Sequence, residues 1–282
     1  AAHPGPHPVM VHFHPGGLKS GNRFSDATCG VRCGRPGDKQ VLAPDVLAAA
    51  GFAVATVDYR LCSAAPQTTY PGQLHDARQA IRWLRANAAK YELDPTRVGC
   101  FGMSAGGGLC IGLAVGQGVP ALAEPGVLAD GLDAVQVGVS TSGFVDFFAQ
   151  ERTKHYAANS IWVPLCAFGG SDELHRWAKQ GVVTLSRLRP ELQESIHEHS
   201  FLHVMRHRPK EAPAPAPLFF AHGELDNVHP IEPAQALHSL LLEPSVSTEF
   251  HESRGIGHTS CHNATAQPRA IEFVKRHLRV GV

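Results

Sequence analysis

Short apolar runs that alternate with longer helical patterns are the feature that most restricts how this chain can fold. Two of these runs, FAVATV at 52–57 and PLFFA at 217–221, are apolar almost without interruption, which is typical of strands covered on both faces. Six strands are predicted, at Val9–Phe13, Ala53–Asp58, Val98–Met103, Ala134–Ser140, Leu218–His222 and Ser247–His251. Because strands that alternate with helices form βαβ units, the chain predicts an α/β fold with a mostly parallel central sheet flanked by helices.

The helix with the clearest signal covers Leu74–Tyr91, where apolar residues recur on one face at helical spacing. Pro71 and Gly72 precede it and Asp94-Pro95 follows it, as is common at helix boundaries. Four other helices are predicted between the strands, at Pro44–Ala50, Ala105–Val115, Ile231–Leu242 and Thr265–Leu278.

Residues 144–216 break this alternation. The stretch follows a strand without leading promptly to another, carries scattered aromatic residues and ends in the stiff APAPAP run at 212–217. Long segments of this kind inside a compact domain are usually functional. We expect a helical, cap-like insertion over the carboxyl ends of the strands, where open α/β sheets place their sites. Since no linker divides the chain, residues 1–282 are expected to form a single domain.

Charge and hydropathy exclude several classes of protein. The 25 basic side chains are balanced by 25 acidic ones, whereas a nucleic-acid-binding protein needs a basic face. No apolar run reaches the roughly 18 residues of a membrane span, and no signal-peptide pattern opens the chain. We therefore expect a cytoplasmic protein with no nucleic-acid partner and no membrane span.

The seven cysteines show no zinc-binding spacing. Cys100 and Cys110 are expected to be small buried apolar residues. Cys29 and Cys33 lie in a glycine-rich loop and are close enough in sequence for a tight disulfide. The alternative is that these two, like the other cysteines, are reduced thiols of an intracellular protein.

The sequence Gly102-Met103-Ser104-Ala105-Gly106 lies between a predicted strand and a predicted helix. A nucleophilic serine on such a strand-to-helix turn needs glycines two residues before and two residues after it, because the chain passes close to itself there. The turn exposes the serine Oγ and directs a helix N-terminus toward developing negative charge. We interpret Ser104 as a nucleophile, the alternative being an ordinary glycine-rich turn.

A serine nucleophile requires a base and an acid that orients the base. Asp226 and Glu224 lie in one loop directly after a predicted strand, and His258 follows the next strand in the glycine-containing loop SRGIGHTS. The order Ser, Asp, His with each residue just past a strand matches this kind of turn. We favour Asp226 as acid over Glu224, and His258 as base over the nearby His251 and His262.

Backbone N–H groups that stabilise an oxyanion are predicted after the first strand. His14-Pro15-Gly16-Gly17 follows VMVHF there, and adjacent glycines leave their N–H groups accessible. Because Pro15 has no N–H, the donors are expected to be Gly16 and Gly17, together with Ala105 at the start of the helix after Ser104.

These motifs together resemble the esterases of α/β-hydrolase fold. The segments are HFHPGG at 12–17, VDYRL at 57–61, the block at 78–109, HGELDNVHP at 222–230 and GIGH at 255–258. They are most similar to the hormone-sensitive-lipase-like and the acetyl- or feruloyl-esterase-like branches. The resemblance implies the roles given above for Ser104, Asp226, His258, Gly16, Gly17 and Ala105, and bracing roles for Asp58, Tyr59, Arg60 and Asp76. The HGGG of such esterases reads HPGG here, and the chain opens at what resembles their third strand.

The resulting hypothesis is a serine esterase that hydrolyses short-chain or small aromatic carboxylic esters through an acyl-enzyme. Its partner would be a small-molecule ester in a pocket formed by Phe144, Phe147 and Trp162, and no metal or organic cofactor is expected. One alternative is an amidase or peptidase of the same fold, similar to arylformamidase or prolyl oligopeptidase, and another is a non-catalytic binding protein. His199, His203 and His207 recur every four residues and are a weaker candidate for a metal site. The oligomeric state is not predicted.

Overall fold

Six parallel strands form one sheet in the computed structural model, which describes residues 5–24, 41–62, 69–127, 130–147, 190–258 and 263–281. The strand order is β2-β1-β3-β4-β5-β6. The strands are β1 His7–Phe13, β2 Ala53–Val57, β3 Leu93–Met103, β4 Val137–Thr141, β5 Leu218–Gly223 and β6 Thr248–Ser253. All six predicted strands are confirmed. β3 begins at Leu93 rather than Val98 because Leu93 pairs with His7 of β1, so the strand includes the predicted break at Asp94-Pro95.

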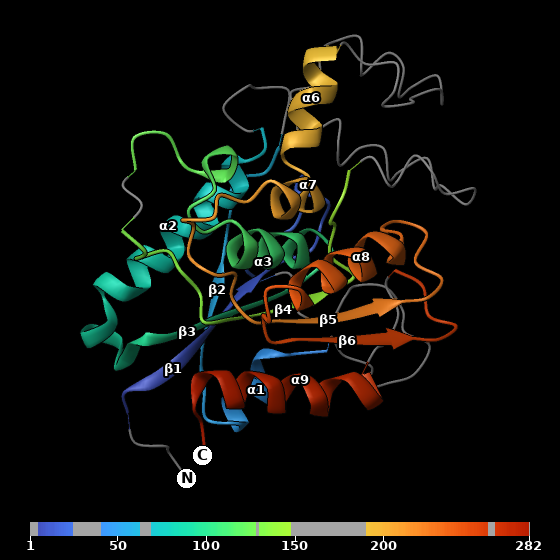
Figure 1. Ribbon diagram of the computed structural model, residues 1–282. Helices are drawn as coiled ribbons and strands as arrows, with labels where there is room; N and C mark the ends of the chain where they lie inside the picture. Colours follow the sequence, from blue (N-terminus) through green and yellow to red (C-terminus); the bar gives the residue numbers. More distant parts are fainter. Residues whose placement is uncertain are drawn as a thin grey trace.

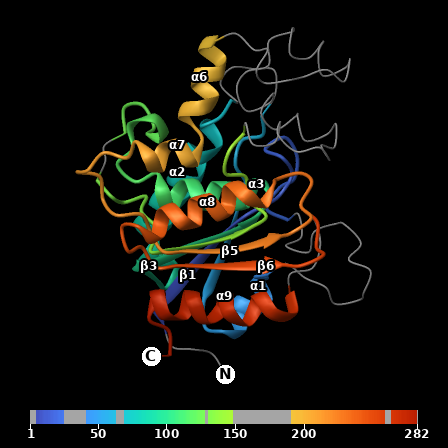
Figure 2. The same ribbon diagram turned by 45° about the vertical axis from the view of Figure 1, so that its right-hand side comes forward.

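Helices cover both faces of the sheet (Figures 1 and 2). α2, α3 and α8 lie on one face, and α1 and α9 lie on the other. Their bounds are α1 Pro44–Ala49, α2 Gly72–Ala86, α3 Ala105–Val115, α8 Ile231–Leu242 and α9 Asn263–Leu278. Each predicted helix is confirmed, and the 3-10 turns η2 Ala88–Tyr91 and η3 Pro120–Leu122 follow α2 and α3. Within the described ranges, no helix combines the length and the apolar character that a membrane span requires.

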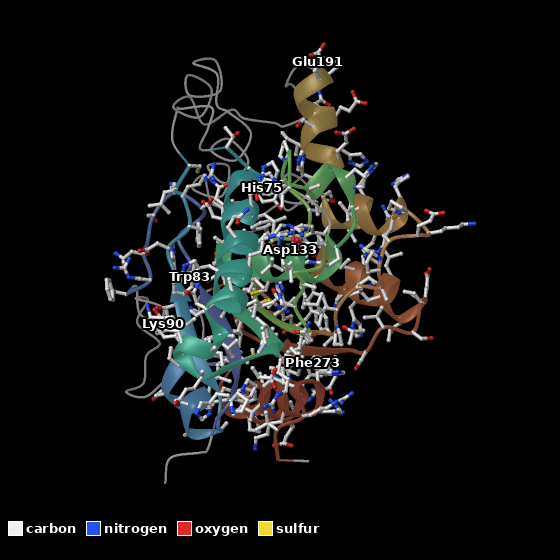
Figure 3. The ribbon with its side chains drawn as sticks, turned by 90° about the vertical axis from the view of Figure 1, so that its left-hand side faces the viewer. His75, Trp83, Lys90, Asp133, Glu191 and Phe273 are labelled. Carbon is white, nitrogen blue, oxygen red and sulfur yellow. The ribbon has the colours of Figure 1, made fainter. Side chains whose placement is uncertain are left out.

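Amphipathic helices explain this arrangement. α2 buries Leu74, Ala77 and Ile81 on the sheet side, whereas Trp83 on its outer face is half exposed (Figure 3). α9 buries Phe273 against Phe219 of β5 on the opposite face of the sheet. α3 differs from both, because all of its residues are buried, as expected for an apolar helix enclosed by the sheet and other helices.

The predicted insertion at 144–216 is described only in part. Its C-terminal portion forms α6 Pro190–Glu198 and α7 Phe201–Arg206. α7 packs against α3 and α8, and α6 projects beyond that layer (Figure 1). Residues 148–189, which include Trp162, lie outside the described residues. The cap over the carboxyl ends of the strands therefore stays a prediction. So does the single domain formed by residues 1–282.

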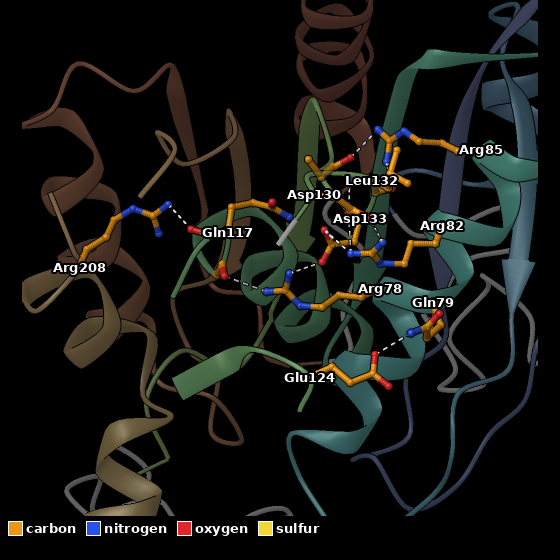
Figure 4. A network of polar contacts seen from close by, with 12 residues as sticks. Arg78, Gln79, Arg82, Arg85, Gln117, Glu124, Asp130, Leu132, Asp133 and Arg208 are labelled. Atoms are coloured by element: carbon orange, nitrogen blue, oxygen red, sulfur yellow. Dashed lines mark hydrogen bonds and ion pairs between the residues drawn. The ribbon is translucent and has the colours of Figure 1, made fainter. Parts of the chain in front are cut away.

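Arginine side chains hold the C-terminal end of α3 (Figure 4). Arg78 of α2 donates from Nη2 to Gly116 O (2.9 Å) and from Nη1 to Asp133 Oδ2 (2.5 Å). Arg208 donates to Val115 O and, at 2.7 Å, to Gln117 O. Terminal carbonyls of a helix have no intrahelical donor and favour a nearby cation. The two guanidinium groups therefore supply the missing donors, next to a cavity of about 340 Å³ that Arg78, Gln117 and Pro213 help to line.

The cysteines differ in part from the expectation. Cys100 and Cys110 are free and buried, as predicted. Cys62 is disulfide-bonded, so the interpretation of all cysteines as reduced thiols is wrong for this residue. Cys29 and Cys33 lie outside the described residues, and a disulfide between them stays a prediction.

Replacing Arg78 with Met is expected to destabilise the protein strongly. The substitution leaves the buried Asp133 carboxylate and Gly116 O without their main donor, and breaking a buried ion pair typically costs about 3–5 kcal/mol. We expect about 3 kcal/mol, because Arg82 Nη2 remains 3.7 Å from Asp133. Urea denaturation measures the change. The control is Lys275→Met, which removes an ion pair to the exposed Glu272 and should cost less than about 1 kcal/mol. Equal losses of stability in the two variants would contradict a stabilising role of Arg78 at the end of α3.

Candidate active site

The predicted site residues meet at one edge of the sheet, where the parallel strands end. The strand register pairs Phe13 with Gly102, Met103 with Thr141, and Gly223 with Ser253. Ser104 follows β3 directly, Asp226 lies in the loop after β5, and His258 lies in the loop after β6. The glycines of the His14–Gly17 segment follow β1. Segments far apart in the sequence therefore contribute to one site, as is usual for open α/β sheets.

Ser104 occupies a strained turn between β3 and α3. Its φ and ψ are 54° and −118°, a backbone conformation that residues other than glycine seldom adopt. A Cβ added to Gly106 would lie 1.9 Å from Phe13 O, and one added to Gly102 would lie 2.5 Å from the carbonyl carbon of Gly106. The glycines on either side of Ser104 are therefore required by close backbone contacts, which an ordinary glycine-rich turn does not need.

His258 links Ser104 to Asp226 through hydrogen bonds. His258 Nε2 lies 2.9 Å from Ser104 Oγ, and Nδ1 lies 3.0 and 2.9 Å from the two Asp226 carboxylate oxygens. A carboxylate only accepts hydrogen bonds, so Nδ1 carries the proton and Nε2 is free to accept one from the serine hydroxyl. The arrangement can remove a proton from Ser104 and hold the imidazole in the required tautomer.

The Asp226 carboxylate is surrounded by donors and its side chain has no solvent exposure. Oδ1 accepts hydrogen bonds from the backbone N–H groups of Val228 (2.9 Å) and His229 (2.8 Å), and His222 Nε2 lies 3.3 Å from Oδ2. Burial alone would raise the pKa of Asp226, but the hydrogen bonds from His222 and His258 and their charges hold it well below its ordinary value. Asp226 is therefore ionised at neutral pH. Sequence reasoning missed His222, although its place at the end of a buried strand just before Asp226 was a usable signal.

The rival residues have other partners. Glu224 Oε2 accepts a hydrogen bond from Gly255 N (2.8 Å), so this carboxylate braces the loop that carries His258. His251 lies near Thr265 Oγ1 and Arg269 Nη1 at 3.1 and 3.3 Å. His262 lies outside the described residues. The structure thus brings Asp226, and not Glu224, to His258.

The segment after β1 lies beside the turn of Ser104. Gly16 and Gly17 have φ values of 128° and 62°, which glycine adopts without strain. The segment is braced by Tyr59, whose hydroxyl donates to His14 O (2.7 Å) and whose ring stacks on that of His14. Ala105 is the first residue of α3, where N–H groups have no intrahelical acceptor. These positions are compatible with the donors predicted at Gly16, Gly17 and Ala105.

The other three residues to which the resemblance gives bracing roles, Asp58, Arg60 and Asp76, form ion pairs. Arg60 donates to Asp76 from Nε at 2.8 Å and from Nη2 at 2.6 Å. Arg23 Nη1 donates a hydrogen bond to the carboxylate of Asp58, the residue that follows β2. These contacts hold the loops that flank the segment after β1.

Phe144 and Phe147, predicted to line a substrate pocket, have exposures of 1% and 0%. Their rings stack at 4.8 Å and contact Tyr70, which lies two residues before α2. Phe144 fills the space beside Gly108 of α3 and lies edge-on to His229. The two rings therefore form an aromatic layer behind the site residues, with no surface open to solvent. Contact with a substrate stays a prediction, as does the role of Trp162.

The three histidines at 199, 203 and 207 have local partners. His199 Nδ1 lies 2.6 Å from Ser195 O, and His207 Nδ1 lies 3.0 Å from His203 O. The rings of His203 and His207 stack at 4.0 Å. In the part of the chain that the structure describes, no group of three or more His, Cys, Asp or Glu residues is arranged to bind a metal.

Comparison with known proteins identifies the family. The BD-FAE family model matches residues 1–166, more than half of the chain. The chain belongs to the BD-FAE family. Carboxylesterase NlhH of Mycobacterium tuberculosis is 35% identical over 102 residues, which cover 36% of this chain and 27% of NlhH. Versiconal hemiacetal acetate esterase of Dothistroma septosporum is 24% identical over 258 residues, covering 90% of this chain and 66% of that protein. The chain thus matches about a quarter of the length of the first relative and two thirds of the second.

Solved structures show the same fold. A truncated carbohydrate esterase from gut microbiota superposes with a TM-score of 0.65 at 22% identity, covering 97% of this chain and 86% of that one. A bacterial heroin esterase gives a TM-score of 0.60 at 23% identity, covering 98% and 75%. The fold is therefore that of the α/β-hydrolases, and the fold predicted from the sequence is confirmed.

Gly106→Ala is expected to destabilise the turn at Ser104. The new methyl group would lie 1.9 Å from Phe13 O, a backbone atom that moves only if β1 moves, and overpacking of this kind costs about 1–3 kcal/mol. Gly112→Ala on the same helix is the control, because its methyl group meets only ends of side chains, Leu74 Cδ1 at 3.0 Å and Phe201 Cζ at 3.1 Å, rather than backbone. Thermal and urea unfolding of both variants measure the difference. Equal stabilities would show that the contact between β1 and the turn is not restrictive.

Proposed function

We propose that this protein is a serine esterase that hydrolyses carboxylic esters through a Ser104, His258 and Asp226 triad. The observation that carries the proposal is the hydrogen-bonded chain from Ser104 Oγ through His258 to the buried Asp226 carboxylate. A serine in a strained strand-to-helix turn, paired with a base and an oriented acid, is the arrangement that activates a hydroxyl for acyl transfer. The esterase names of the relatives support the same reaction class.

The geometry suggests each step. Ser104 Oγ attacks the ester carbonyl while His258 Nε2 takes the hydroxyl proton, and Asp226 stabilises the imidazolium. The N–H groups of Gly16, Gly17 and Ala105 would donate to the oxyanion, and losing one such donor typically costs about 100- to 1000-fold in rate. The imidazolium then protonates the leaving alkoxide, which departs as an alcohol. Water, deprotonated by His258, cleaves the acyl-enzyme and releases the carboxylic acid.

We propose a short acyl group or a small aromatic acid as the preferred substrate portion. Phe144 and Phe147 pack tightly against each other and against α3, so this side of the site offers little room for a long acyl chain. Each methylene group that a pocket accepts or refuses changes specificity by about 1–3 kcal/mol. One relative is named versiconal hemiacetal acetate esterase, and this name refers to an acetate, which is a short-chain ester. An amidase or peptidase, or a non-catalytic binding protein, is favoured by no observation in the structure.

The first test combines covalent labelling with a series of esters. Wild-type protein should be labelled at Ser104 by a fluorophosphonate and should hydrolyse p-nitrophenyl esters, with kcat/KM highest for acetyl to butyryl and at least about tenfold lower for octanoyl. Ser104→Ala should lose labelling and hydrolysis while its thermal unfolding is unchanged. A matched p-nitroanilide separates amidase from esterase. Hydrolysis by Ser104→Ala at more than a tenth of the wild-type rate would contradict the assignment of the nucleophile.

Asp226→Asn and Glu224→Gln distinguish the two acids. Asp226→Asn should lower kcat by about 10⁴-fold, because the amide can stabilise the wrong imidazole tautomer. Glu224→Gln should change kcat by no more than about twofold, because the amide oxygen can still accept the hydrogen bond from Gly255. Steady-state kinetics on an acetyl ester measures both variants. The reverse ranking would make Glu224 the acid.

A further inference from the structure

The side chain of His229 is a buried titratable group that the proposed mechanism does not use. His229 lies three residues after Asp226 and has an exposure of 3%. Its ring centroid is 4.7 Å from that of His258, and the two ring planes are nearly perpendicular at 87°. The only imidazole in the proposed mechanism is thus packed directly against a second one.

The hydrogen bond of the His229 side chain anchors its ring to the turn after β4. His229 Nδ1 lies 2.8 Å from Ser142 O, and since a carbonyl only accepts, Nδ1 must carry the proton. The residue before Ser142 holds the nucleophile, because Thr141 O accepts the N–H of Ser104 (2.8 Å). The ring that contacts His258 is therefore fixed relative to the backbone that holds Ser104.

The backbone of His229 contacts the acid. Its N–H donates to Asp226 Oδ1 at 2.8 Å, and its carbonyl oxygen lies 2.8 Å from His222 Nε2, the atom that also faces Asp226 Oδ2. One residue thus touches the acid through its main chain and the base through its side chain.

The His229 ring is uncharged near neutral pH. Burial, followed by repulsion from His258, lowers the pKa of His229 to about 3, although Asp226 and the bond to Ser142 act in the opposite direction. The ionisable groups that face it are His258, His222 and Asp226. A neutral neighbour does not add positive charge beside the imidazolium that forms on His258, so the contact is steric and does not oppose protonation.

We infer that His229 is a positioning residue that holds the ring of His258 in plane with Ser104 Oγ and Asp226. This inference rests on the proposed function, because it concerns the base of that reaction. The His258 ring is held by its hydrogen bonds to Ser104 and Asp226, and the perpendicular His229 ring at 4.7 Å limits its rotation about the Cβ–Cγ bond on that side. Misplacing a reacting group by about 1 Å can cost about 100-fold in rate.

His229→Asn is the most informative substitution. The asparagine amide is a donor that can replace Nδ1 on Ser142 O, and the substitution leaves the main-chain contacts to Asp226 and His222 in place. The substitution removes the ring, and with it the contacts to His258 and Phe144. His238→Asn is the matched control, since His238 is a partly buried histidine whose Nδ1 lies 3.0 Å from Thr248 Oγ1 on β6.

His229→Asn should lower kcat on an acetyl ester by about 100-fold with little change in KM. It should slow fluorophosphonate labelling of Ser104 to a similar extent. His238→Asn should stay within about twofold of wild type.

A wild-type kcat together with a wild-type rate of fluorophosphonate labelling in folded His229→Asn would overturn the inference. If His229→Asn unfolds, as judged by thermal melting, His229→Gln is measured by the same criteria. The proposed function fails separately, when wild-type protein neither hydrolyses the ester nor is labelled at Ser104. Hydrolysis by wild type together with equal hydrolysis by the variant contradicts only the role of His229.

Discussion

The close approach of the end of β1 to the turn after β3 is the constraint on which the candidate site depends. Phe13 O occupies the space that side chains at Gly102 and Gly106 would fill. The contact brings the segment after β1, with its two glycine N–H groups, beside Ser104, where Tyr59 braces it through His14. Backbone packing therefore sets the relation between Ser104 and its proposed oxyanion donors, while side-chain hydrogen bonds set the relation between Ser104 and His258.

Much of the fold and the positions of the main site residues could be predicted from local patterns. The interior strands β1 and β5 could be recognised from their continuous apolar runs, because both of their faces are covered. Ser104, Asp226 and His258 could be selected because each follows a strand, and parallel strands end at one edge. Asp226 and Glu224 are both plausible by position, and only the fold shows which carboxylate contacts His258.

Features that arise from contacts between distant residues could not be predicted. β3 begins earlier than its apolar run because its first residue pairs with β1. Phe144 and Phe147 are aromatic residues near the site, yet Gly108 and Tyr70 enclose them in the core. The partners of His222 and His229 become visible only when the turn after β4 is placed beside the loop after β5.

The arginine side chains at the far end of α3 have a consequence for the position of Ser104. α3 has eleven residues, so it spans about 16 Å, and it is rigid because neighbours enclose it on all sides. Ser104 lies at one end of this rod, while Arg78 and Arg208 hold the carbonyls at the other. The position of Ser104 along the helix axis is thus fixed from both ends of α3, by backbone packing at one end and by cations at the other.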